Sequence, residues 1–143
     1  MTTYLLDTNI ASHIIKGDIA RVRERLVAVP MHCVAVSVVT QAELLYGVAK
    51  RGHPHGLTAR VSAFLARVTV LPWTPEVGAV YADFRADCEA AGTPLAPLDM
   101  MIAAHAKALD IAAASIEGTV LLITRDAAFS HVPGGLKLDD WTK

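Results

Sequence analysis

The sequence lacks most features that mark secreted, membrane-spanning or nucleotide-binding proteins. It has only two cysteines, Cys33 and Cys88, which are too few and too far apart for a disulfide framework. Its first residues carry no basic segment or cleavage site of a secretion signal, and no apolar run reaches the length of a membrane span. We therefore expect a cytoplasmic protein in which both thiols are buried.

Several catalytic motifs are also missing. There is no Gly-x-Gly-x-x-Gly, no Gly-x-x-x-x-Gly-Lys-Ser/Thr and no Gly-x-Ser-x-Gly, so dinucleotide sites, P-loops and serine hydrolase elbows are disfavoured. The six histidines include no His-Glu-x-x-His spacing, and His53 and His55 flank a proline in a polar turn. Surface histidines explain this pattern better than zinc ligands do.

The composition is typical of one folded domain. The chain has 143 residues, 53% of them hydrophobic and 19% charged, with a mean hydropathy of +0.40. This length suits a single domain with one sizeable core, which we place at residues 1–143. A net charge of -1 gives no sign, by itself, of a polyanionic partner.

Short β-branched runs alternate with segments of helical spacing along the whole chain. This alternation predicts an α/β fold, namely a three-layer α/β/α sandwich with a short central parallel sheet. The run at 68–71 is short and β-branched, and we interpret it as an inner strand. Strands are predicted at 3–6, 33–36, 68–71 and 119–123, and helices at 9–16, 18–29, 38–50, 58–67, 75–91 and from 99 to at least 109.

Four acidic residues lie where an apolar stretch gives way to a turn or to the start of a helix: Asp7, Glu43, Asp99 and Asp126. Open α/β sheets gather their chemistry at the carboxyl ends of the strands. Carboxylates gathered there repel one another unless they share a cation, and hard divalent cations such as Mg²⁺ prefer oxygen ligands. Such an ion can activate water and stabilise a phosphoryl transition state. The pattern therefore predicts a metal-dependent phosphodiesterase.

Each acid also has a purely structural explanation. Asp7 and Asp99 could be helix N-caps, since aspartate is favoured there. The spacing Thr40-x-x-Glu43 fits a capping box, in which the glutamate reaches back to a backbone N–H. Asp126 could make a local turn bond to the backbone. For each residue taken singly, the sequence leaves both interpretations open.

Three polar neighbours could support such a site. Asn9 follows Asp7 by two residues and could orient a ligand or cap a helix. Thr124 could donate to a neighbouring acid or serve as an ordinary strand residue. Arg125 could meet a phosphate, although an exposed surface arginine is the simpler interpretation.

Aromatic side chains and one histidine are weaker candidates. Trp73, Tyr46 and Phe129 could stack on bases, but core packing is the simpler role for all three. His105 follows Asp99 by six positions, which places the two on different faces of the predicted helix. A general-base role for His105 is therefore disfavoured.

Three segments stand out: residues 4–10 (Tyr-Leu-Leu-Asp-Thr-Asn-Ile), 37–47 around Glu43, and 98–106 around Asp99. Together they resemble the signature blocks of PIN domains, and in particular those of the VapC toxins of bacterial toxin–antitoxin pairs. Residues 123–126 (Ile-Thr-Arg-Asp), followed by Phe129 and Trp141, are similar to the C-terminal block of that family. The likeness covers essentially the whole chain in order.

The resemblance implies an endoribonuclease that depends on Mg²⁺ or Mn²⁺, with Asp7, Glu43, Asp99 and Asp126 as its acidic set. It also implies a homodimer that a VapB-type antitoxin neutralises. Within that family it favours tRNA as substrate, in particular the anticodon stem-loop of initiator tRNA. The alternative is a catalytically impaired PIN-like module that binds RNA or an antitoxin without cutting.

One segment departs from the family pattern. Residues 107–119 are rich in alanine and longer than the short glycine turn that usually joins this helix to the next strand. The extra stretch is expected either to lengthen the helix or to form an outward loop. Either outcome could shift Asp126 away from the other three acids.

Overall fold

A five-stranded parallel sheet forms the centre of the computed structural model, which describes residues 1–143. The strand order is β3-β2-β1-β4-β5, and every neighbouring pair is parallel. The predicted α/β class is confirmed. The strands are β1 (Thr2–Leu6), β2 (Val34–Ser37), β3 (Thr69–Leu71), β4 (Thr119–Ile123) and β5 (Leu138–Asp139).

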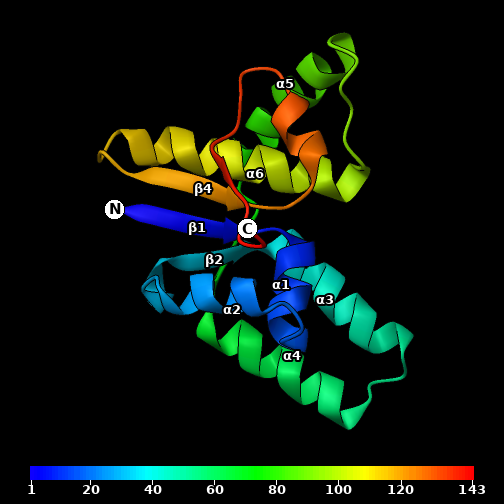
Figure 1. Cartoon of the computed structure of the whole chain (residues 1–143). Coiled ribbons are helices and arrows are strands. Elements are labelled where there is room, and N and C mark those ends of the chain that lie inside the picture. The colour runs from blue at the N-terminus through cyan, green and yellow to red at the C-terminus, as the bar shows by residue number, and fades with distance from the viewer.

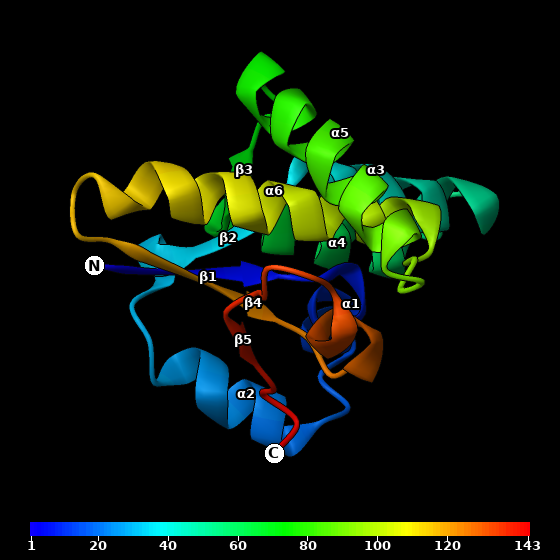
Figure 2. The same cartoon turned by 90° about the horizontal axis from the view of Figure 1, so that it is seen from above.

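Helices cover both faces of this sheet (Figures 1 and 2), which confirms the three-layer arrangement. Successive side chains of a strand point to opposite faces, so Leu5 packs into the core beneath α5 and α6, and Leu6 into the core with α1, α2, α3 and α4. The helices are α1 (Thr8–Lys16), α2 (Ala20–Val27), α3 (Val38–Lys50), α4 (His55–Arg67), α5 (Pro75–Ala90) and α6 (Pro97–Ala114).

Two details of the sheet differ from the sequence prediction. The strand at 69–71 pairs only with β2, so it lies at the edge of the sheet and the inner-strand prediction was wrong. Its burial fits this place, because Thr69 is exposed and the next two residues are only half-buried. The opposite edge is β5, which the sequence did not reveal because a two-residue strand shows no alternation.

The alanine-rich stretch lengthens α6, which continues to Ala114. A tight turn then leads into β4, closed by the N–H of Gly118 donating to the carbonyl of Ala113 at 2.8 Å. Asp110 ties this end of the helix to the sheet, since its Oδ1 accepts from the N–H of Val120 at 2.9 Å. The extra alanine-rich residues therefore extend α6 and are accommodated before β4 begins, at the amino end of that strand.

Both cysteines are buried, as predicted. Among the six helices, none combines the length and the apolar character needed to cross a membrane.

Candidate active site

The sheet reverses its strand order between β1 and β4. From β1 the chain builds outward through β2 and β3, then returns to place β4 on the other side of β1. Ligands of open α/β sheets bind outside the carboxyl ends of the strands at such a switch point. Asp7 follows β1 directly and Thr124 follows β4, and the N–H of Asp7 donates to the carbonyl of Ile123 at 3.0 Å. The two strand ends are therefore held side by side (Figure 1).

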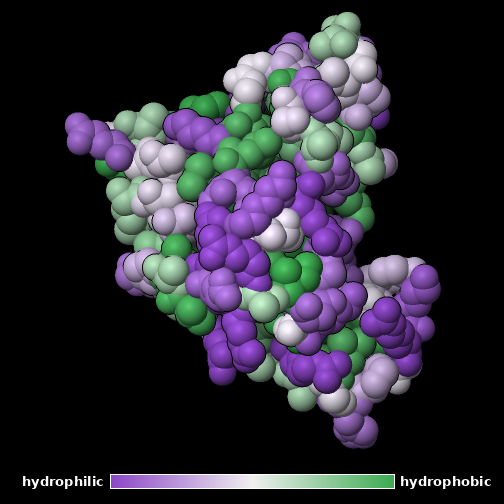
Figure 3. Space-filling view, viewed as in Figure 1, coloured by the Kyte–Doolittle hydropathy of each residue, from purple (hydrophilic) through white to green (hydrophobic).

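A pocket of about 390 Å³ lies at this switch point. Three of the four predicted acids line it together with Asn9 and Arg125, and no apolar residue does. In the space-filling view the outline of the molecule is indented between the part with α5 and α6 and the part with α3 and α4, with hydrophilic residues around it (Figure 3). Segments more than 100 residues apart in sequence thus converge on one polar pocket. The three acids are Asp7, Asp99 and Asp126.

Asp7 is both a helix cap and a pocket residue. Its Oδ1 accepts from the N–H of Ile10 at 2.8 Å, at the start of α1, and the residue is only 4% exposed. Burial raises the pKa of Asp7, hydrogen bonds from Thr124 and from Ile10 act against this, and the charge of Asp126 adds to it. The cap accounts for one carboxylate oxygen, and the residue remains a buried acid beside a second one.

Asp99 is the acid without a hydrogen-bond partner in the protein. The helix begins at Pro97, so Asp99 lies in its first turn and the N-cap interpretation was wrong. Burial raises the pKa of Asp99, and the charges of Asp7, Asp126 and Glu43 raise it further. A carboxylate that is repelled by three others and held by no donor is suited to an added cation.

Asp126 stays at the pocket despite the longer helix before β4. Its N–H donates to Oγ1 of Thr124 at 3.1 Å, and its Oδ1 accepts from the N–H of Ala128 at 2.9 Å. The second bond caps a short 3-10 helix (Ala127–His131). The local turn bond and the place in the pocket therefore occur together, and the side chain is exposed to solvent.

Glu43 belongs to the same acidic set but turns its carboxylate toward α1. The capping-box interpretation was wrong, because Ser37 caps α3 by accepting from the N–H of Val39 at 3.1 Å. Thr8 instead donates from Oγ1 to Oε1 of Glu43 at 2.7 Å. The same hydroxyl lies 3.0 Å from Oγ1 of Thr40. Glu43 consequently lies beside the pocket, near enough for its charge to raise the pKa of Asp99.

Arg125 is the one cation that lines the pocket, and a histidine positions it. Its Nη2 lies 3.0 Å from Nε2 of His13, whose Nδ1 lies 2.8 Å from Oδ1 of Asp18. Arginine only donates, so Nε2 accepts and Nδ1 carries the proton that is donated to Asp18. This hydrogen bond lowers the pKa of Asp18. No local sequence signal marks these contacts, because His13 and Arg125 are 112 residues apart.

His105 and the aromatic residues lie outside the pocket. His105 is fully buried and its Nδ1 lies 2.7 Å from Oγ of Ser37, so it faces the core and not the acidic pocket. Burial lowers the pKa of His105, which keeps the ring neutral. Phe129 is buried and Trp73 packs against His105, in accord with core roles. The core role was wrong for Tyr46, which is 64% exposed.

The donor set of this site suits a hard divalent cation. Its side chains are carboxylates, an amide and hydroxyls, which are the oxygen ligands that Mg²⁺ and Mn²⁺ prefer. In the arrangement described, no group of three or more acidic, histidine or cysteine side chains is placed to hold an ion. Asp7, Asp126 and Glu43 each accept a hydrogen bond from a donor within the protein. Binding of one ion by three of these side chains would therefore require them to rearrange.

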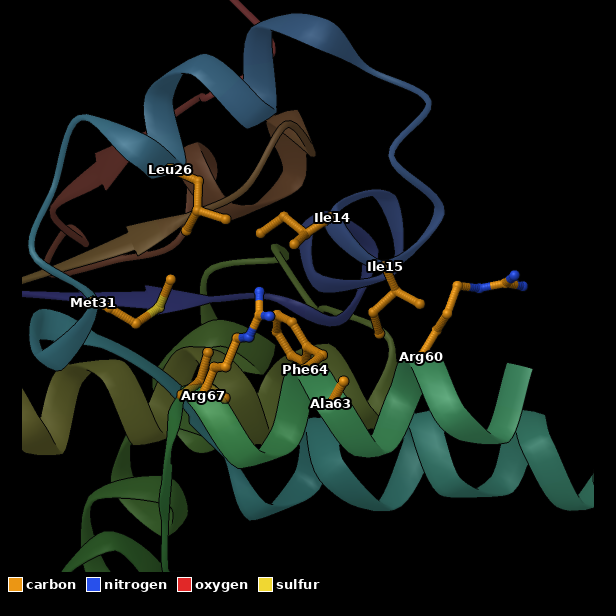
Figure 4. Close-up of a pocket in the computed structure, with 9 residues that line it drawn as sticks. Ile14, Ile15, Leu26, Met31, Arg60, Ala63, Phe64 and Arg67 are labelled. Carbon is orange, nitrogen blue, oxygen red and sulfur yellow. The ribbon is translucent and has the colours of Figure 1, made fainter. Parts of the chain in front are cut away.

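A second pocket has a different character (Figure 4). It measures about 200 Å³ and lies between α1, α2 and α4. Side chains such as Ile14, Leu26 and Phe64 make it mainly apolar, and Arg60 and Arg67 are its only charged residues. With no acid, thiol or hydroxyl in its lining, it offers packing surface rather than reactive groups.

Comparison with known proteins adds independent information. Residues 4–135 match the PIN domain family. A tRNA(fMet)-specific endonuclease VapC of Shigella flexneri is 32% identical over 142 residues, which covers 99% of this chain and 100% of the relative. Ribonuclease VapC2 of Haemophilus influenzae is 30% identical over 141 residues, covering 99% of each chain. A chain of DNA-bound VapBC from Salmonella typhimurium superposes with a TM-score of 0.84 at 30% identity, covering 99% of each chain.

Proposed function

The chain belongs to the PIN domain family and, within it, to the VapC ribonuclease toxins, and from this we propose that it hydrolyses RNA with the help of a divalent cation. One observation carries the proposal. Asp7, Asp99 and Asp126 leave different elements of the chain and line one polar pocket at the switch point of the sheet. Structural capping alone does not require that convergence.

The cation of the proposal is Mg²⁺ or Mn²⁺. Asp7, Glu43 and Asp99 would hold it, directly or through water, and Asp126 would support it or a second ion. When bound, such an ion polarises the scissile phosphate and lowers the pKa of a water molecule near it. Attack of water on phosphorus with departure of the 3′-oxygen would leave a 5′-phosphate and a 3′-hydroxyl, the products that the resemblance to VapC toxins implies.

The protein's own side chains position the substrate. Arg125 is the cation beside the acids, and its guanidinium can donate to phosphate oxygens. The contact with His13 holds that guanidinium at the pocket before RNA arrives. Thr124 supports Asp7 and Asp126 from the end of β4, and Asn9 adds an amide at the rim. These groups orient the phosphate and the acids, so less ordering remains when RNA binds.

The proposed substrate and partners are inferred from the names of the similar proteins. We propose tRNA as the substrate, with the initiator tRNA anticodon stem-loop as the first candidate, because the Shigella relative is named for tRNA(fMet). We also propose a VapB-type antitoxin as partner, a homodimer as the toxin's own state, and action in the cytoplasm. The VapBC structures that resemble this chain support the antitoxin, and the apolar pocket between α1, α2 and α4 gives its side chains a place to pack.

Incubation of the purified protein with end-labelled total tRNA tests the proposed activity. We expect discrete fragments with Mg²⁺, none with EDTA, and none from Asp99→Asn in either condition. Sequencing of the fragment ends should locate the cut and show a 5′-phosphate. Fragments that persist in EDTA or in Asp99→Asn would refute a metal-dependent reaction at this pocket.

A binding module without catalysis is the second candidate. The observation in its favour is that no three acids are placed to hold an ion in the arrangement described. Such a protein would retain tRNA without producing fragments while Mg²⁺ is bound. An interaction module would instead copurify with its antitoxin after loss of all four acids and show no affinity for RNA.

A further inference from the structure

A groove with basic side chains lies beside the acidic pocket. It measures about 430 Å³ and runs between α1 and α3, with α4 contributing to its far wall. Glu43 and Thr8 line its near end, and they are joined by the 2.7 Å hydrogen bond. No residue lines both cavities, but Thr8 lies between Asp7 and Asn9 of the acidic pocket in sequence, and the charge of Glu43 raises the pKa of Asp99, so the two are neighbours.

Regular spacing on two helices builds the walls. On α3, Tyr46 and Gly47 follow Glu43 by three and four residues, and Lys50 follows them by four and three, which places these residues on one face. On α1, the lining residues Thr8, Ser12 and Lys16 recur at intervals of four. Each wall therefore starts at the acidic site and ends at a lysine.

The cations of the groove are free to meet an anion. Lys16, Lys50 and Arg51 are exposed, and none of them forms an ion pair within the protein. By contrast, Arg21, Arg25 and Arg85 each bond to a carboxylate. Three unpaired cations along one groove form a track for a chain of phosphates.

The middle of the groove offers an aromatic ring and open space. Tyr46 lines it and is 64% exposed, an unusual state for a large aromatic side chain without a partner. Beside it, a Cβ built on Gly47 would meet no atom within 4 Å. Glycine in the middle of a helix lowers its stability, so this residue keeps the groove open at a cost.

We propose that this groove binds the single-stranded RNA that continues from the scissile phosphate. Lys16, Lys50 and Arg51 contact successive phosphates, and one base stacks on the ring of Tyr46. The acidic pocket alone repels a polyanion, and the adjoining groove supplies the attraction that holds the strand there. The inference rests on the proposed ribonuclease function, because it names the path of that enzyme's substrate.

The salt dependence of RNA binding tests the phosphate contacts. Binding of a short fluorescent single-stranded RNA is measured by anisotropy without Mg²⁺, in an Asp99→Asn background that leaves the RNA intact. Three lost contacts should reduce the slope of log affinity against log salt by about 2, since each contributes about 0.7 for single strands. The test variant combines Lys16→Gln, Lys50→Gln and Arg51→Gln.

A matched variant controls for net charge. It removes three exposed arginines that lie outside the groove and form no ion pairs, so the total charge changes equally. Its salt slope should stay closer to that of the parent than to that of the groove variant. Equal salt slopes for both variants would overturn the proposal, because they would show that RNA binding depends only on the total charge of the protein and not on contacts in the groove. The control combines Arg23→Gln, Arg60→Gln and Arg67→Gln.

Substitutions in the middle of the groove test stacking and open space. Tyr46→Ala should weaken RNA binding roughly 5- to 150-fold, whereas Tyr46→Phe keeps the ring and should bind like the parent. Gly47→Leu should fill the groove and weaken binding while the melting temperature is kept or raised. Unchanged binding in Tyr46→Ala and Gly47→Leu would overturn the proposal.

Cleavage and partner binding separate this inference from the proposed function. If wild-type protein fails to cut tRNA with Mg²⁺ while the groove variants lose RNA binding, the ribonuclease proposal fails and the groove assignment stands. If wild-type protein cuts and the triple groove variant cuts with an unchanged KM, the groove assignment fails alone. Poly-glutamate serves as a competitor, and groove variants that lose only poly-glutamate would assign the groove to an acidic protein segment instead of RNA.

Discussion

A pair of substitutions at Asp7 separates its two roles. Asp7→Asn keeps an oxygen that can accept from Ile10, whereas Asp7→Ala removes it. Both variants remove the carboxylate from the pocket, so we expect both to lose RNA cleavage. Only Asp7→Ala should also lose the cap of α1.

The magnitude of the stability difference follows from burial. Loss of a side-chain N-cap costs about 0.5–2 kcal/mol, and asparagine caps about as well as aspartate. Ile10 is fully buried, so its N–H would be left without water, and we expect a value near the upper end, about 2 kcal/mol. A domain of 143 residues has an unfolding entropy of about 0.3 kcal/mol/K, so Asp7→Ala should melt about 7 °C below Asp7→Asn.

The charge of Asp7 adds a second expectation for metal-free protein. Burial raises the pKa of Asp7, so its ionised form is disfavoured in the folded state at neutral pH. Asp7→Asn removes that charge and should melt at or above the temperature of the wild type in EDTA. Mg²⁺ should raise the wild-type melting temperature and leave that of Asp7→Asn unchanged.

Differential scanning fluorimetry with EDTA or Mg²⁺, combined with the tRNA cleavage assay, measures both roles. Full cleavage activity in Asp7→Asn would refute the catalytic assignment and leave Asp7 as a cap alone. Equal melting temperatures for Asp7→Asn and Asp7→Ala would refute the capping argument.

Three further predictions concern the surroundings of the pocket. Thr8→Val should lower the affinity for Mn²⁺ about 10-fold or more in a titration, because Glu43 loses its positioning hydroxyl, while Thr8→Ser should keep it. Ser37→Ala should lower the free energy of unfolding in urea by about 2–4 kcal/mol, since α3 loses its cap and buried His105 loses its partner; a loss within error of zero would contradict this. Burial and then neighbouring carboxylates raise the pKa of Asp99, so metal-free Asp99→Asn should be more stable than wild type at neutral pH. That gain should vanish below about pH 4, where the carboxyl is protonated in both folded and unfolded chains, and a gain that persists in acid would point to another cause.

Local patterns in the sequence predicted the fold class, and they predicted that the acids lie at the carboxyl edge of the sheet. Strands and helices alternate, and Asp7 and Asp126 follow strands that are neighbours. The sequence posed capping and site formation as alternatives for these two residues. In the folded chain they coexist, because a carboxylate has two oxygens and the cap engages one of them.

Other features depend on contacts that sequence spacing does not encode. The place of β3 at the edge is set by strand pairing, which the sequence of a three-residue strand leaves undetermined. Tyr46 lies on a helix whose apolar residues suggested core, and only the position of α1 and α4 decides that its ring faces an open groove. The contact between His13 and Arg125 joins α1 to the segment after β4, far along the chain.

Anomalous diffraction from crystals soaked in Mn²⁺ measures the shared site most directly. Our account requires an anomalous peak within coordination distance of carboxylate oxygens of both Asp7 and Asp99, with the side chain of Glu43 turned toward it. A fully occupied Mn²⁺ site elsewhere on the molecule, with no ion at the carboxylates of Asp7 and Asp99, would contradict our account.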